Sequence, residues 1–180
     1  FFCFFNESFG GINTDSLSKV FASMPDDTNK VVQLNTKANY LIKKDLDAAL
    51  ILIQQSVRTS EKMGYDLLLA NSLKLKAKIL RKQGNNKEAI EDYKSALLLY
   101  EKLGKTLSAA KVLNSIGARY FYMKDLSNAL SFFKRSAELR AKVKDSIGMA
   151  KVYNNIGEIY RMLEEYDKAL ENHYRSLSFK

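Results

Sequence analysis

The chain contains one cysteine and one histidine, the residue types that most often bind metals or act as nucleophile and base. Cys3 and His173 lie at opposite ends of the sequence, which is not a zinc-binding pattern, and a single cysteine cannot form an internal disulfide. The motifs HExxH, GxxxxGK[ST] and GxSxG are absent, as is the glycine fingerprint of dinucleotide-binding folds. We therefore expect no enzymatic activity, no metal and no cofactor, and we interpret His173 as a packing residue.

Lysine and asparagine recur at matching positions, where they could bind a peptide. Residues 151–160 read KVYNNIGEIY, and residues 111–120 read KVLNSIGARY. Asparagine can donate to and accept from a peptide amide, and lysine can hold a carboxylate or phosphate. The same residue types also occur on an ordinary solvated helix face, and the spacing alone does not decide between the two interpretations.

The repeated phrase belongs to a 40-residue period that predicts the elements holding these side chains. Each period contains two apolar stripes at helical spacing, separated by a short polar break, which predicts two helices of about 17 or 18 residues. In the breaks KKD, QGN and MKD, the Asp or Asn is placed to cap the second helix. Small residues at Ala77, Gly117 and Gly157 predict close approach of the two helices. The 40-residue step relates these positions: Tyr40, Leu80, Tyr120 and Tyr160; Ala49, Ala89, Ala129 and Ala169; Ser56, Ala96, Ser136 and Ser176.

These positions resemble the tetratricopeptide repeat, in its long-period form. The third segment supplies the best match, although the chain has no Trp and lacks the Pro that closes many such repeats. The matching residues of that segment are Leu113, Ile116, Gly117, Tyr120, Ala129, Phe133 and Ser136. The resemblance implies an all-α fold, a right-handed superhelical solenoid of antiparallel helix pairs with about four repeats.

The pattern divides the chain into three parts. Residues 1–14 are Phe-rich and resemble the tail of a signal peptide, or else a short apolar segment that packs on the first helices. Residues 15–25 are expected to form a short helix and linker. Residues 26–180 form four repeats, and we expect the array to continue beyond the last of them, because solenoids end in a polar cap. The repeats span 26–64, 65–104, 105–144 and 145–180.

The resemblance also implies that the first helices of successive pairs line a concave groove. Family members that grip a terminal carboxylate use Lys and Asn there, but this sequence does not reproduce the full clamp pattern. The residues expected to face the groove are Asn71, Lys74, Lys78, Arg81, Lys111, Asn114, Phe121, Lys151, Asn154 and Arg161.

The net charge of +9 favours an anionic partner. We predict a non-catalytic module that binds a protein or peptide, with the positive charge favouring an acidic one, as the sensory or scaffolding part of a larger bacterial signalling protein. The alternative is a cytoplasmic regulator that binds a short signalling peptide. The scattered lysines argue against nucleic acid, and the helices show no membrane-inserting pattern. The Phe-rich start favours an extracytoplasmic (periplasmic) location, with a cytoplasmic one as the alternative, and the sequence leaves the oligomeric state open.

Overall fold

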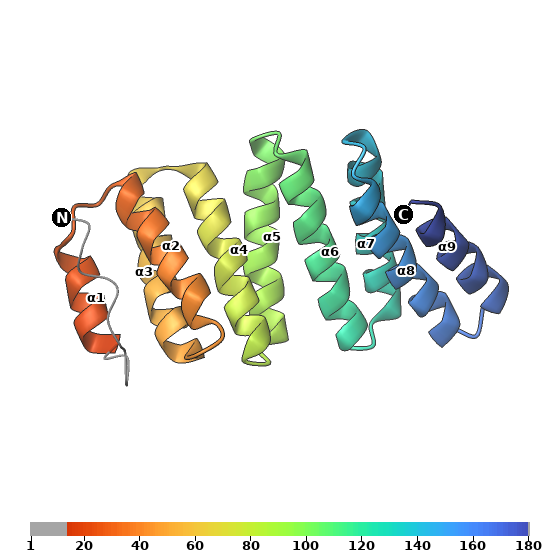
Figure 1. Cartoon of the computed structure of the whole chain (residues 1–180), viewed down its shortest axis with the longest axis horizontal. Helices are drawn as coiled ribbons and strands as arrows, with labels where there is room; N and C mark the ends of the chain where they lie inside the picture. Colours follow the sequence, from red (N-terminus) through yellow and green to blue (C-terminus); the bar gives the residue numbers. More distant parts are fainter. Residues whose placement is uncertain (1–13, 180) are drawn as a thin grey trace.

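The computed structural model describes residues 14–179, and all regular structure in that range is helical. The helices lie side by side in chain order from α1 to α9 (Figure 1). Consecutive helices pack as the antiparallel pairs α2/α3, α4/α5, α6/α7 and α8/α9, which confirms the all-α solenoid of about four repeats. The helices are α1 (Thr14–Ser23), α2 (Thr28–Leu41), α3 (Leu46–Met63), α4 (Asp66–Lys82), α5 (Asn86–Lys102), α6 (Thr106–Tyr122), α7 (Leu126–Lys142), α8 (Ser146–Met162) and α9 (Tyr166–Ser178). Most of residues 1–14, where the signal-peptide interpretation falls, lie outside the described range.

Helix lengths and caps follow the predicted period closely. Helix α3 has 18 residues and each of α4 to α8 has 17, as predicted. Asp45 caps α3 by accepting from the backbone N–H of Ala48 at 2.9 Å, and Asp125 caps α7 in the same way. The predicted cap at Asn85 is wrong, since its side chain makes no such bond to α5. A neutral amide gains less than a carboxylate from the positive end of the helix dipole.

The six turns that connect α3 through to α9 share one unusual backbone conformation. Gly64, Gly84 and Gly104 have positive φ values of 66°, 88° and 64°, which a glycine adopts at low cost. The corresponding turns further along the chain use Lys124, Lys144 and Glu164, with φ values of 65°, 55° and 60°. The fold therefore requires a left-handed residue at these turns even where the sequence does not provide a glycine.

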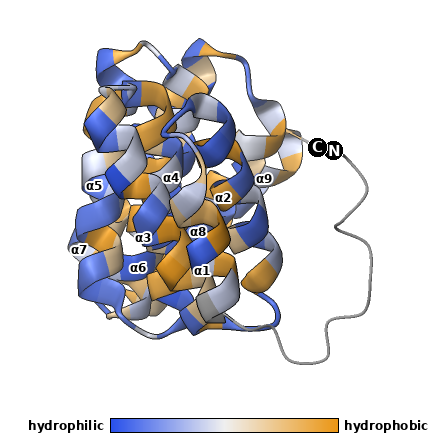
Figure 2. Ribbon diagram, turned by 90° about the vertical axis from the view of Figure 1, so that its left-hand side faces the viewer, coloured by the Kyte–Doolittle hydropathy of each residue, from blue (hydrophilic) through white to orange (hydrophobic). Residues whose placement is uncertain are grey.

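Small residues allow the helices of a pair to pack closely, as predicted. Ala49, Ala89 and Ala129 are fully buried on the second helices. A methyl group added at Gly117 would lie 2.9 Å from the ring of Phe133, and one added at Gly157 would lie 2.8 Å from the ring of His173. Figure 2 shows apolar residues concentrated where the two layers of helices meet. The ring of His173 thus lies against Gly157, and its side chain is 33% exposed.

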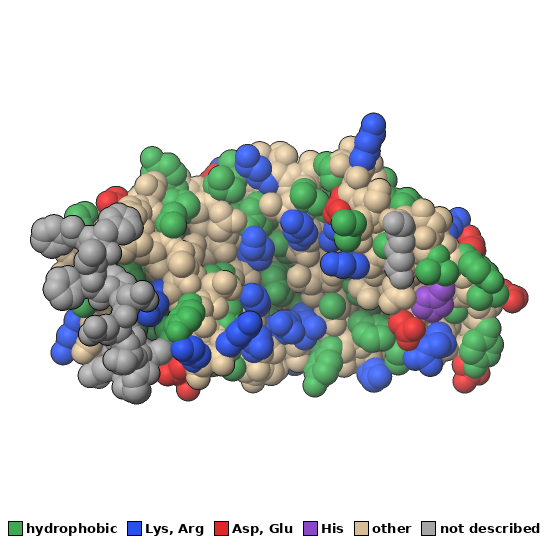
Figure 3. Space-filling model, in the orientation of Figure 1, with side chains coloured by type: hydrophobic (Ala, Val, Ile, Leu, Met, Phe, Trp, Pro, Cys, Tyr) green, Lys and Arg blue, Asp and Glu red, His purple; other side chains and the backbone are tan. Residues whose placement is uncertain are grey.

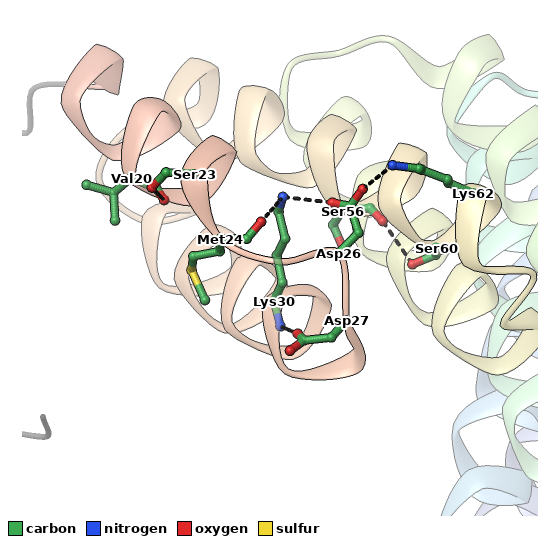
Figure 4. Close-up of polar contacts among 9 residues, drawn as sticks. All are labelled: Val20, Ser23, Met24, Asp26, Asp27, Lys30, Ser56, Ser60 and Lys62. Atoms are coloured by element: carbon green, nitrogen blue, oxygen red, sulfur yellow. Dashed lines mark hydrogen bonds and ion pairs between the residues drawn. The ribbon is translucent and has the colours of Figure 1, made fainter.

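A buried lysine of α2 binds the linker that connects α1 to the repeats (Figure 4). The ammonium group of Lys30 donates to the backbone carbonyl of Met24 at 3.1 Å and to Asp26 at 2.9 Å. Asp26 also accepts from Lys62 of α3 at 2.6 Å. These two hydrogen bonds from lysines, Lys62 first, lower the pKa of Asp26 to about 2. The linker between α1 and α2 is thus fixed by charge as well as by apolar contact.

Candidate functional site

The first helices α2, α4, α6 and α8 form one face of the array, which we call the first-helix face. In Figure 1 the helices α2 and α8 lie in front of their partners, so Figure 3, in the same orientation, shows this face. Lys and Arg side chains gather in its middle, over α4 to α6. The lysines are scattered in the sequence, but the fold brings Lys74, Lys78 and Lys111 together.

These three lysines form a basic cluster with no acidic partner. Among residues 14–179, none of them forms an ion pair with a carboxylate. The pKa of Lys74 lies below its usual value, first because the side chain is partly buried and then because Lys111 and Lys78 repel its charge. Lys78 donates instead to the amide oxygen of Asn39 on α2, at 3.1 Å. The cluster therefore holds positive charge that an anion could neutralise.

Tyr100 of α5, the second helix of its pair, contacts Lys74 of this cluster. The ammonium group of Lys74 lies 5.5 Å from the ring centroid of Tyr100. The Tyr100 hydroxyl donates to the side-chain oxygen of Asn71 at 2.6 Å, and burial raises the pKa of Tyr100 to about 12. The oxygen of Asn71 thus already accepts one hydrogen bond, and its amide nitrogen makes none within residues 14–179.

Arg119 extends the basic cluster, although the sequence interpretation did not include it. Arg119 lies on α6. Burial lowers the pKa of Arg119, and the positive charge of nearby Arg81 lowers it further. Its Nη1 donates to Asn86 at 3.3 Å, while its buried Nε has no partner among the described residues. The only feature of the sequence that could have indicated Arg119 is its position one helical turn after Ser115, next to the helix face of Lys111 and Asn114.

The remaining predicted residues lie apart from the basic cluster. Asn114 accepts a long hydrogen bond of 3.4 Å from Asn155 of α8, so it bridges neighbouring first helices. Phe121 is partly buried and lines a small cavity of about 80 Å³ between α6 and α8. Lys151 and Asn154 line a separate pocket of about 530 Å³ with α9 residues. Arg161 is paired within its own helix to Glu158, at 2.9 Å.

The first-helix face thus offers hydrogen-bonding and cationic groups. No group of three His, Cys, Asp or Glu side chains within residues 14–179 could hold a metal ion. None of the helices in that range combines the length and hydropathy needed to cross a bilayer.

Successive antiparallel helix pairs with a left-handed turn residue and small residues at each crossing define a helical-repeat protein. Tetratricopeptide repeat models match residues 69–103 and 108–180, so matched segments cover more than half of the chain. The chain belongs to the tetratricopeptide repeat family. A search of curated protein sequences finds no match.

Solved structures with the same fold come from several kinds of protein. BtubC from P. vanneervenii is 20% identical with a TM-score of 0.77, over 93% of this chain and 69% of that one. Aspartyl phosphate phosphatase F from Bacillus subtilis is 17% identical with a TM-score of 0.82, over 92% and 44%. A STAND signal-transduction ATPase from Pyrococcus horikoshii, which has a tetratricopeptide repeat sensor, is 16% identical with a TM-score of 0.80, over 92% and 26%. The chain is thus less than half the length of the last two proteins, and at these identities the likeness concerns the fold.

Proposed function

We propose that this chain is a non-catalytic interaction module that binds an acidic segment of a partner protein across the first-helix face. The observation that supports the proposal is the basic cluster of Lys74, Lys78 and Lys111, which has no acidic partner within the described chain. Holding like charges together costs free energy, and burial of Lys74 adds to that cost. A carboxylate-rich segment would remove the repulsion and gain charge-assisted hydrogen bonds.

The basic cluster also indicates where such a segment would lie. Lys78 reaches from α4 to α2, and Lys111 approaches Lys74 from α6, so the cluster spans three successive first helices. An extended or helical peptide crossing these helices would meet several cations in turn. Lys151 and Asn154 would contact the same segment further along, at their own pocket on α8.

We further propose that the module is the sensory or scaffolding part of a larger signalling protein. Two proteins of similar fold support this, since one is an aspartyl phosphate phosphatase and the other contains a repeat sensor. An extracytoplasmic location is also our proposal, and it rests on the Phe-rich segment at residues 1–14 alone.

Binding of a labelled acidic peptide tests the proposed interface. A fluorescein-labelled dodecapeptide of alternating Glu and Ala should bind, with affinity falling as salt rises. The double variant Lys74→Gln, Lys111→Gln should weaken binding about tenfold or more, the equivalent of about 1.4 kcal/mol. The matched control Lys87→Gln, Lys142→Gln removes the same charge from exposed positions on the second helices and should bind almost normally.

Two outcomes would contradict the proposal. Equal weakening by both double variants would mean that net charge alone attracts the peptide. Stronger binding of a DNA oligonucleotide of the same charge as the peptide would instead favour a nucleic-acid partner.

A further inference from the structure

A third cavity lies on the other side of α8 from Lys151. It measures about 510 Å³ and lies between α7 and α9, with α8 as its floor. Tyr153 and Tyr160 line it from α8, Ala137 from α7 and Asn172 from α9. Lys151 and Tyr153 are two residues apart on α8, so their side chains point about 200° away from each other. We call this cavity the α7–α9 slot.

The preceding repeat shows what fills the equivalent space. Forty residues before Asn172 stands Phe132, whose ring stacks on Tyr120 with centroids 5.4 Å apart and planes 12° apart. Phe132 and Tyr120 both pack against the main core cluster there. Tyr160 is the counterpart of Tyr120, but Asn172 is too short to reach across its ring in the same way.

The wall of the slot on α7 is also reduced. Ala137 corresponds to Leu97 of α5, and Ala141 corresponds to Glu101. Leu97 is buried in the preceding repeat and contributes to its core. Asn172, Ala137 and Ala141 are therefore smaller than their counterparts in the preceding repeat. Other lining residues are larger, namely Met149, Tyr153, Lys168 and Glu171 in place of Ala109, Leu113, Asn128 and Ser131. The slot beside Tyr160 is the space that remains where the ring of Phe132 has no equivalent.

The chemistry of the slot suits a ring that carries a hydrogen-bond donor. Asn172 is 8% exposed, and its amide nitrogen donates to the backbone carbonyl of Lys168 at 2.8 Å. Its side-chain oxygen accepts no hydrogen bond from residues 14–179, so it can accept one from a ligand. Lys168 lies over the face of Tyr160 at 5.5 Å, but its side chain is 58% exposed and can move aside.

We propose that the α7–α9 slot binds an aromatic side chain of a partner polypeptide, stacked on Tyr160 as Phe132 is stacked on Tyr120. Offset stacking of two rings at this separation adds to the free energy gained by burying the ring itself. A tyrosine or tryptophan would in addition donate to the free oxygen of Asn172. This site is separate from the basic cluster of Lys74, Lys78 and Lys111, because it is formed by α7, α8 and α9 and needs no negative charge in its ligand. Tyr153 of the slot also stacks on Phe179, which lines the pocket of Lys151 and Asn154.

Titration with short capped peptides, followed by amide chemical shifts, tests the slot. The peptide Ac-Ala-Ala-Tyr-Ala-Ala-amide should produce saturable shifts at Tyr153, Tyr160 and Asn172, and the Leu analogue should bind at least fivefold more weakly. The variant Asn172→Phe fills the slot from within, so peptide binding should fall tenfold or more while helix content stays unchanged. If that variant does not fold, Tyr160→Leu removes the stacking surface and should weaken binding to the same extent.

The reciprocal variant provides a positive control. Phe132→Asn removes the ring that covers Tyr120 and should create a second site, with new shifts at Tyr120 on peptide addition. The proposal is overturned if the wild-type chain shows no saturable shift at millimolar peptide, if the Leu analogue binds equally well, or if Asn172→Phe still binds. Tighter binding of free tyrosine than of the capped peptide would overturn the assignment to a polypeptide side chain.

Discussion

Replacement of Gly117 by alanine tests the claim that small residues set the spacing of the helix pairs. The added methyl group would lie 2.9, 3.0 and 3.2 Å from three ring carbons of Phe133. Phe133 is 1% exposed, so the only space its ring borders is the small cavity of about 80 Å³ that it lines with Phe121. The helices of the pair must therefore separate, or the ring must adopt a strained rotamer.

The magnitude follows from two opposing effects. Overpacking of a filled core costs about 1–3 kcal/mol, and the near-complete burial of the Phe133 ring places this site in the upper half of that range. Alanine regains about 1 kcal/mol through its higher helix propensity. We expect Gly117→Ala to lower the free energy of unfolding by about 1–2 kcal/mol, measured by urea denaturation followed by circular dichroism.

The chain contains its own control at Gly157, which holds the same position one repeat later. A methyl group there would lie 2.8 Å from the ring of His173, but that side chain is 33% exposed and can swing into solvent. Gly157→Ala should therefore be neutral, or stabilising by up to about 1 kcal/mol. Equal destabilisation by both variants would refute the argument from ring mobility, and a stabilising Gly117→Ala would refute the argument from close packing.

Three further predictions concern turns and charges. Lys124→Gly should raise the free energy of unfolding by about 0.5–1 kcal/mol in urea melts, because a left-handed lysine costs more than the extra flexibility of glycine. The pKa of Asp26 is lowered from 3.8 to about 2, so the unfolded chain takes up a proton at a higher pH than the folded chain does. The stability that Asp26 gains from Lys30 and Lys62 should therefore be present above about pH 4 and disappear towards pH 2, as measured in acid melts. The pKa of Lys74 is lowered in the folded chain, so the free energy of unfolding should rise as pH increases towards 10.5. Lys74→Gln removes the charge, so it should stabilise the chain at pH 7 by an amount that shrinks at high pH.

Each of these has an outcome that would contradict it. If Gly84→Ala and Lys124→Gly both destabilise, the left-handed turn is not the controlling factor at these positions. If Asp26→Asn leaves the acid melt unchanged, another carboxylate controls it. If Lys74→Gln destabilises at pH 7, the stem of the lysine stabilises the fold more than its charge costs, and the contact with Tyr100 outweighs the repulsion.

The frame of the fold could be predicted from the sequence because packing imposes the same demand in every repeat. Gly117, Ala129 and Tyr120 recur at fixed steps, and the structure places them at the helix crossings as predicted. The partners of the displayed side chains could not be predicted in this way. The period aligns Asn154 with Asn114, yet the residue that contacts Asn114 is Asn155, because the angle between successive repeats decides which side of α8 approaches α6.

The second helices also carry positions whose residue type changes from repeat to repeat, which the prediction of displayed residues on the first helices did not include. Position 132 of the third repeat is a core-covering Phe, while the same position is Asp92 in the second repeat and Asn172 in the fourth. Asp92 is neutralised by Lys76 at 2.9 Å, Phe132 stacks on Tyr120, and Asn172 borders an open slot. One repeat position therefore serves as ion pair, packing residue or cavity wall without any change in the backbone frame. A repeat protein can acquire a binding site at a position where the residue type varies without changing the helix packing. Position 132 and its equivalents on the second helices are such a position.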